Sequence, residues 1–208
     1  MAIGQSLVDF QTSLAQCDSL ISSAHKVDAS GTSLFPPADR QQITVAAFLN
    51  LFIAWETFIE ASVVDFMMGG VTLSGALPVR YVSPPTREHS NRMLLHVQRY
   101  FDFANHDNIR KITNLYFGSG FPFDTPLSSI NAELSDLKTI RNACAHLSST
   151  TKTALEGLAT RIFGQPQPGI GVYRLLTTID PRVRGNDTTV YAAYRDKLIA
   201  AASLIAQG

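Results

Sequence analysis

An uncharged stretch of fifteen residues, Gln41–Trp55, most constrains how this chain can fold. A membrane-spanning helix needs about 18 or more apolar residues, and several polar residues interrupt this shorter stretch. A helix is predicted over residues 39–68, ending at Gly69-Gly70, and its centre, residues 45–66, is apolar nearly all round, which predicts that the helix is buried. Such a helix has to be covered by the other helices of a bundle or by a second subunit.

The rest of the chain shows helical periodicity. Residues 2–27 place apolar side chains three and four positions apart, which predicts an amphipathic helix. The segment 172–180 fits a strand as well as a helix. Further helices are predicted over residues 86–104, 109–117, 126–150 (capped by Thr125 before Pro126), 152–163, and from a cap at Asp187 to about residue 206. These elements predict an all-α antiparallel bundle in one domain, residues 1–208, with a core of about 1–165 and a C-terminal extension of about 166–208 with short added helices.

Charge and cysteine content narrow the class of protein. The 208 residues include 17 basic and 17 acidic side chains, so the whole molecule does not attract nucleic acid by net charge. Residues 1–75 carry a net charge of −5 and residues 76–208 a net charge of +5, so a polyanion would meet the second part. Two cysteines form no disulfide framework and suit a reducing cytosol. The first ten residues have no basic region or long apolar run, so no signal peptide is expected and the chain is predicted to be cytoplasmic.

The segment "IRNACAHLSS", residues 140–149, places three polar side chains in a helix that otherwise looks like core. On a helix, Asn142 and His146 share one face and Arg141 flanks it. A histidine can transfer protons and an arginine can stabilise charge on phosphorus, which phosphodiester chemistry requires when no metal takes part. Asn142 would orient His146 or bind phosphate. The alternative is a satisfied histidine beside an arginine whose stem covers apolar surface.

This segment resembles the R-x(4–6)-H motif of the HEPN superfamily. The context is similar too, with a long first helix, a second helix containing "AWETFIEASVVDF", and a late motif helix, "SDLKTIRNACAHLSS". The resemblance covers roughly residues 1–165 and is to the HEPN-type ribonucleases of bacterial defence and toxin systems, including RiboL-PSP-HEPN-like proteins. Arg141 and His146 match the two fixed positions of the motif, and Asn142 matches the polar position.

The resemblance implies an all-α homodimer in which two motifs face each other and cleave RNA without a metal or cofactor. It also allows a module that binds RNA, nucleotide or a protein partner without cleaving, and an antitoxin or defence-system partner. One toxin subgroup carries a modified tyrosine two residues after the histidine. This chain has Ser148 there, which puts regulation by that route in doubt.

Other candidate residues have competing interpretations. Cys144 cannot pair with His146 on a helix, because residues two apart point to opposite sides, so it is expected to be a small core residue. Glu56 either pairs with Arg141 or ends a buried run. The basic residues Arg92, His96 and Arg99, with His89, form a stripe that either guides RNA or is a solvated face. No zinc or calcium spacing is present in the sequence, and no metal is expected.

Overall fold

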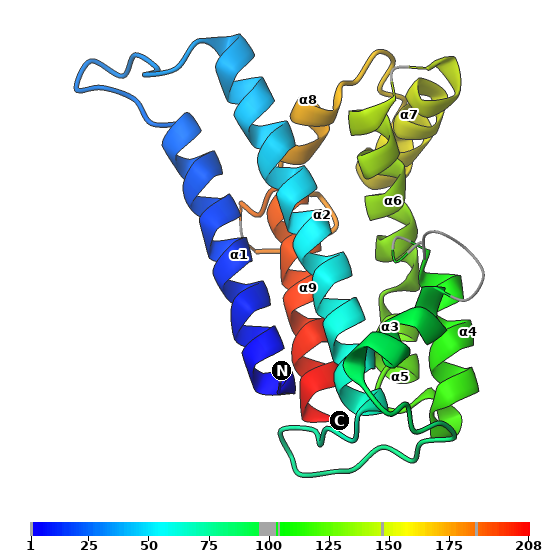
Figure 1. Ribbon diagram of the computed structural model, residues 1–208. Coiled ribbons are helices and arrows are strands. Elements are labelled where there is room, and N and C mark those ends of the chain that lie inside the picture. The colour runs from blue at the N-terminus through cyan, green and yellow to red at the C-terminus, as the bar shows by residue number, and fades with distance from the viewer. Residues whose placement is uncertain (1, 96–102, 104, 147, 186) are drawn as a thin grey trace. The chain divides into compact units, whose positions relative to one another are not determined.

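The computed structural model describes residues 2–95, 103, 105–146, 148–185 and 187–208 (Figure 1). The described residues form nine α-helices and one short 3₁₀ helix, with isolated β-bridges and no strand, so the all-α prediction is confirmed. Two compact units share the chain. Unit 1 contains Met1–Gln11, Ala54–Leu134 and Lys197–Gly208, and unit 2 contains Thr12–Ile53 and Ser135–Asp196.

The helices α1 (Ile3–Ala24), α2 (Pro37–Met67), α6 (Asn131–Ala145) and α9 (Val190–Gln207) each have residues in both units. The helix α2 ends where the sequence predicts, because Gly69 adopts a left-handed φ of 92° and the N–H of Gly70 donates to the carbonyl oxygen of Asp65 at 2.8 Å. Val190, Leu198 and Ala202 of α9 are fully buried. The predicted C-terminal extension therefore supplies core residues.

Aromatic side chains fill the core of unit 1. Phe10 of α1 packs against Trp55 and Phe58 of α2, with ring centroids 6.0 and 5.3 Å apart, and Trp55 is 1% exposed. The ring of Phe123 packs edge-on against the ring of Phe66, with the two centroids 5.7 Å apart. Burying rings of this size removes large apolar areas from water. This burial stabilises the packing of the C-terminal half of α2 within unit 1.

Short helices complete unit 1. They are α3 (Arg87–Leu95), α4 (His106–Tyr116), the 3₁₀ turn Gly118–Gly120 and α5 (Asp124–Ser129). The helix α4 begins earlier than predicted, because the Asn105 side chain accepts hydrogen bonds from the N–H groups of Asp107 and Asn108. The part of the predicted third helix beyond Leu95 falls largely outside the described residues.

The predicted continuous helix over residues 126–150 is wrong. Ile130, with φ −120° and ψ 24°, separates α5 from α6. Thr125 is not the cap, since α5 begins at Asp124 after Phe123. Pro126 then lies in the first turn, where its missing N–H would have had no helical partner.

In unit 2, the C-terminal part of α1 and the N-terminal part of α2 run antiparallel (Figure 1). The other helices of this unit are α7 (Ser149–Phe163) and α8 (Val172–Thr177). The first six residues of the ambiguous segment 172–180 are therefore helical, and Ile179 near its end forms an isolated antiparallel bridge with Thr189. The cap of α9 is Thr189, whose hydroxyl accepts from the N–H of Ala192 at 3.2 Å, and not Asp187 as predicted.

A charged network around two buried aspartates joins α6, α7 and α9 in unit 2. Asp136 of α6 accepts a hydrogen bond from Arg161 of α7 at 2.6 Å and one from the Tyr194 hydroxyl of α9 at 2.8 Å. Arg182 donates to both carboxylate oxygens of Asp180, and its guanidinium lies 5.5 Å from the centre of the Tyr194 ring. Both aspartates are almost fully buried, and their charges are compensated within the network.

Candidate functional site

The predicted motif lies at the C-terminal end of α6, in unit 2. The helix ends at Ala145, but the N–H of His146 still donates to the carbonyl oxygen of Asn142 at 2.9 Å. His146 therefore continues the helical path by one residue and shares a face with Asn142. His146 is exposed, while Arg141 and Asn142 are half-buried. The motif is accessible to solvent and is not sealed in the core.

Asn142 contacts the arginine of the motif. The Nη1 of Arg141 donates to the Oδ1 of Asn142 at 3.2 Å. This hydrogen bond limits the freedom of the guanidinium while leaving most of its donors for other groups. The structure thus shows a contact between Asn142 and Arg141, and the expected roles of Asn142 toward His146 and phosphate remain predictions.

The junction between α6 and α7 fixes the backbone that carries His146. The Thr151 hydroxyl lies 2.5 Å from the carbonyl oxygen of His146. The Ser148 hydroxyl accepts from the N–H of Thr151, and the Thr151 side chain accepts from the N–H of Ser148, which makes a capping box. Ser148, two residues after His146, therefore has a structural role at the start of α7.

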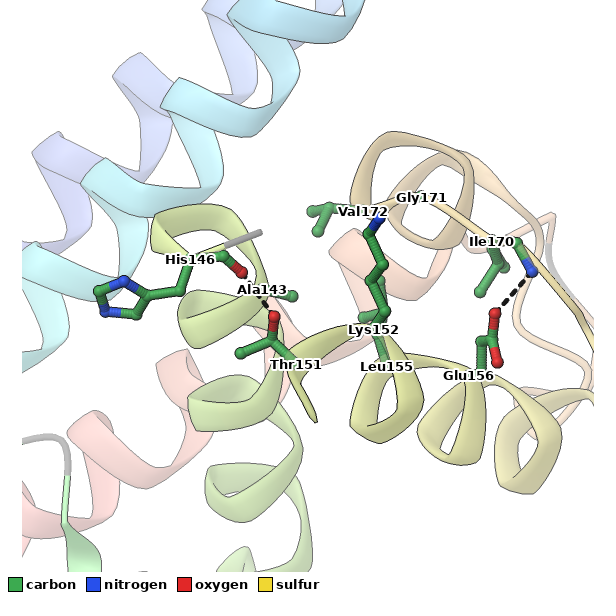
Figure 2. Close-up of a pocket in the computed structure, with 10 residues that line it drawn as sticks. Ala143, His146, Thr151, Lys152, Leu155, Glu156, Ile170, Gly171 and Val172 are labelled. Carbon is green, nitrogen blue, oxygen red and sulfur yellow. Dashed lines mark hydrogen bonds between the residues drawn. The ribbon is translucent and has the colours of Figure 1, made fainter. Parts of the chain in front are cut away.

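A pocket of about 250 Å³ lies beside this junction (Figure 2). Figure 2 shows that the imidazole of His146 points away from Lys152 and the other pocket side chains, while its carbonyl group faces Thr151. Glu156 accepts a hydrogen bond from the N–H of Gly169 at 2.7 Å, which ties the loop before α8 to α7. The pocket is lined by Ala143, His146, Thr151, Lys152, Leu155, Glu156, Gly169, Ile170, Gly171 and Val172. His146 thus borders the pocket through its main chain and presents its ring elsewhere.

Lys152 is a pocket residue that sequence reasoning missed. It is an exposed cation in the first turns of α7, close in sequence to His146. The spacing of Ser148 and Thr151, a helix-start pattern, could have placed the beginning of α7 and with it Lys152. The sequence contained no signal that Gly169 and the segment after it would form the opposite wall.

The supporting residue Glu56 lies elsewhere in the chain. It is half-buried in α2 and belongs to unit 1, whereas Arg141 belongs to unit 2. The pairing of Glu56 with Arg141 remains a prediction.

Only part of the predicted basic stripe can be described. Arg92 is exposed and donates to Glu88 at 2.6 Å, in an i, i+4 pair on the surface of α3. Glu88 offsets part of the positive charge that the stripe would offer to RNA. His96 and Arg99 lie outside the described residues, so the stripe as a whole remains a prediction.

Cys144 is half-buried beside the motif. Burial raises the pKa of its thiol to about 12. A thiol that stays protonated at neutral pH is a poor nucleophile, which agrees with a packing role. Among the residues that the structure describes, no group of three or more His, Cys, Asp or Glu side chains is arranged to hold a metal ion.

The chain matches no family model, no curated protein and no solved structure in comparisons with known proteins. Within the described parts of the chain, α2 is the one helix long and apolar enough to cross a membrane. This criterion rests on length and composition, and the core helix of a soluble protein meets it as well.

Proposed function

We propose that this chain is a metal-independent endoribonuclease of the HEPN type, acting as a cytoplasmic homodimer in a bacterial defence or toxin–antitoxin system. The observation that supports this most is the position of the motif. His146 is exposed at the end of α6, and Arg141, half-buried on the last turns of the same helix, is oriented by Asn142. A phosphodiester that approaches from solvent can thus reach an imidazole that transfers protons and a guanidinium that donates several hydrogen bonds.

The proposed reaction is an internal transfer on RNA. A base removes the proton of a ribose 2′-hydroxyl, the 2′ oxygen bonds to the adjacent phosphorus, and the bond from phosphorus to the 5′ oxygen breaks. An acid then protonates the departing 5′ oxygen, leaving a 2′,3′-cyclic phosphate. In this scheme His146 transfers a proton and Arg141 stabilises the added negative charge on the phosphoryl oxygens.

One histidine covers only one of the two proton transfers at a time. A two-fold dimer would supply a second His146 and a second Arg141, because a symmetric interface brings each patch against its own copy. One imidazole would then act as base and the other as acid. RNA is the proposed substrate, and an antitoxin or defence-system protein the proposed regulator.

Cleavage of RNA in excess EDTA tests this proposal. Purified protein is expected to cut single-stranded or loop RNA and to leave cyclic or 3′-phosphate ends. His146→Ala and Arg141→Ala should each lower the rate by about 10²–10⁴-fold, the usual effect of losing acid–base catalysis. Lys26→Ala, which removes an exposed cation of the same unit, serves as the control and should cut at the wild-type rate.

Circular dichroism of each variant separates lost chemistry from lost folding. Because His146 is exposed, its replacement should leave the helical signal intact. Equal rates for wild type and His146→Ala would show that the catalytic assignment is wrong. RNA binding without cleavage by the wild type would instead support the alternative, a non-catalytic HEPN-like binding module.

A further inference from the structure

The N-terminal half of α2, in unit 2, keeps an apolar face that is only partly covered. Ala38, Gln42 and Ala46 are exposed, and Val45 and Leu49 are half-buried. A shallow groove of about 470 Å³ lies on this half of the helix. Ile53, one turn beyond the groove, is 56% exposed. We call this surface the α2 seam and define it as Ala38, Gln42, Val45, Ala46, Leu49 and Ile53.

The spacing of the α2 seam suits a helical partner. Ala38, Gln42, Val45, Leu49 and Ile53 follow one another at intervals of four, three, four and four residues, which keeps them on one face of the helix. Apolar side chains at such intervals are those that one helix packs against another. No charged residue occurs from Gln41 to Trp55, so a partner helix would bury no charge there.

The α2 seam is complementary to itself in the antiparallel direction. A two-fold axis between Val45 and Ala46 places Val45 opposite the partner's Ala46. The same axis places Ala38 opposite the partner's Ile53, and Gln42 opposite the partner's Leu49. The first and second pairings set a small side chain against a larger one, and this arrangement lets two helices approach closely.

We propose that a second copy of this chain covers the α2 seam, in an antiparallel helix pair centred between Val45 and Ala46. The seam belongs to the same compact unit as Arg141 and His146, so the pairing joins two motif-bearing units. The proposal rests on the homodimer of the proposed function and not on its cleavage chemistry. Oligomeric state tests the first and RNA cleavage tests the second, so the two can fail separately.

The size of the seam predicts a reversible dimer. The helix from Ala38 to Ile53 is roughly 24 Å long at 1.5 Å per residue. Leu34 and Phe35, exposed just before α2, extend the apolar surface. One helix pair of this length is smaller than a standard interface, which buries about 800 Å² on each partner. We therefore expect a dissociation constant in the micromolar range.

The first experiment compares two exposed alanines of unit 2 by analytical ultracentrifugation of the full chain. Ala46→Glu places like charges together at the two-fold axis and should raise the dimer dissociation constant at least about tenfold. Ala15→Glu adds the same charge at an exposed position of α1, which is not part of the α2 seam, and should leave the dimer unchanged. Circular dichroism of both variants checks that each is folded.

The second experiment tests the register. In Gln42→Glu/Leu49→Glu, the facing positions carry like charges and the dimer should dissociate. In Gln42→Glu/Leu49→Lys, each glutamate faces the partner's lysine, so the dimer should persist. These results would support the proposal. A monomeric wild type at micromolar concentration, a dimer unaffected by Ala46→Glu, or equal behaviour of the two double variants would overturn it.

Discussion

The two units close their cores in different ways, although α2 runs through both. In unit 1, Trp55, Phe58 and Phe66 of α2 are buried against other aromatic rings. In unit 2, the network around Asp136 and Asp180 draws α6, α7 and α9 together, while one face of α2 stays partly bare. One apolar helix can thus contribute buried core residues along one stretch and leave an apolar face exposed to solvent along the next.

The largest expected effect comes from the covered stretch. Trp55→Ala removes the ring that packs on Phe10 and leaves a cavity, so the free energy of unfolding should fall by about 3–5 kcal/mol. Urea denaturation followed by circular dichroism measures the change. A loss below about 1 kcal/mol would mean that this half of α2 is no better covered than the seam.

A smaller effect should come from the charged network of unit 2. Burial opposes ionisation of Asp180, but hydrogen bonds and charge from Arg182 outweigh it and lower the pKa of this carboxyl. A lowered folded-state pKa contributes stability above the unfolded-state pKa, and this contribution is lost as the pH falls through the folded-state value. The free energy of unfolding should therefore fall on acidification below the ordinary carboxylate range.

Asp180→Asn isolates this contribution. The variant should be less stable than wild type by about 1–3 kcal/mol at neutral pH, because Arg182 loses its charged partner. The difference should shrink as the pH falls, because the wild-type carboxylate becomes neutral too. A difference that stays constant with pH, measured by urea titration, would show that packing and not charge sets the contribution of Asp180.

The smallest effect on folding is expected in the α2 seam. Ile53→Ala removes a side chain that is more than half exposed, so the unfolding free energy of the monomer should change by less than about 1 kcal/mol. The same variant should weaken the proposed dimer, which sedimentation measures separately. A large loss of monomer stability would mean that Ile53 is covered within one chain, and the contrast between the two stretches would disappear.

Local chemistry made much of the secondary structure predictable. The apolar periodicity located α1 and α2 to within a few residues, and Gly69-Gly70 marked the end of α2 correctly. The break at Ile130 was missed, because an isoleucine in a helical pattern does not indicate an interruption. The cap of α9 was placed two residues early, because Asp187 and Thr189 are both common capping residues and only the hydrogen bond identifies Thr189.

The candidate site, too, was predictable from the sequence only in part. The sequence identified Arg141, Asn142 and His146 as polar residues on one helix, because their spacing follows from helix geometry alone. The side on which the imidazole lies relative to the pocket could not be read from spacing, since it depends on where α6 ends and α7 begins. Lys152 and Gly169 enter the pocket through packing of segments that are separate in the chain.

The sequence by itself determined the all-α class, the long apolar helix and the polar motif, because these follow from periodicity within short stretches of chain. Tertiary structure decided which part of α2 is covered, which residues join Asp136 and Asp180, and which groups line the pocket beside His146. The physical reason is that burial and charge compensation depend on contacts between distant residues. A pattern along the chain shows that a face is apolar, but only the neighbours brought by folding show whether it is already covered.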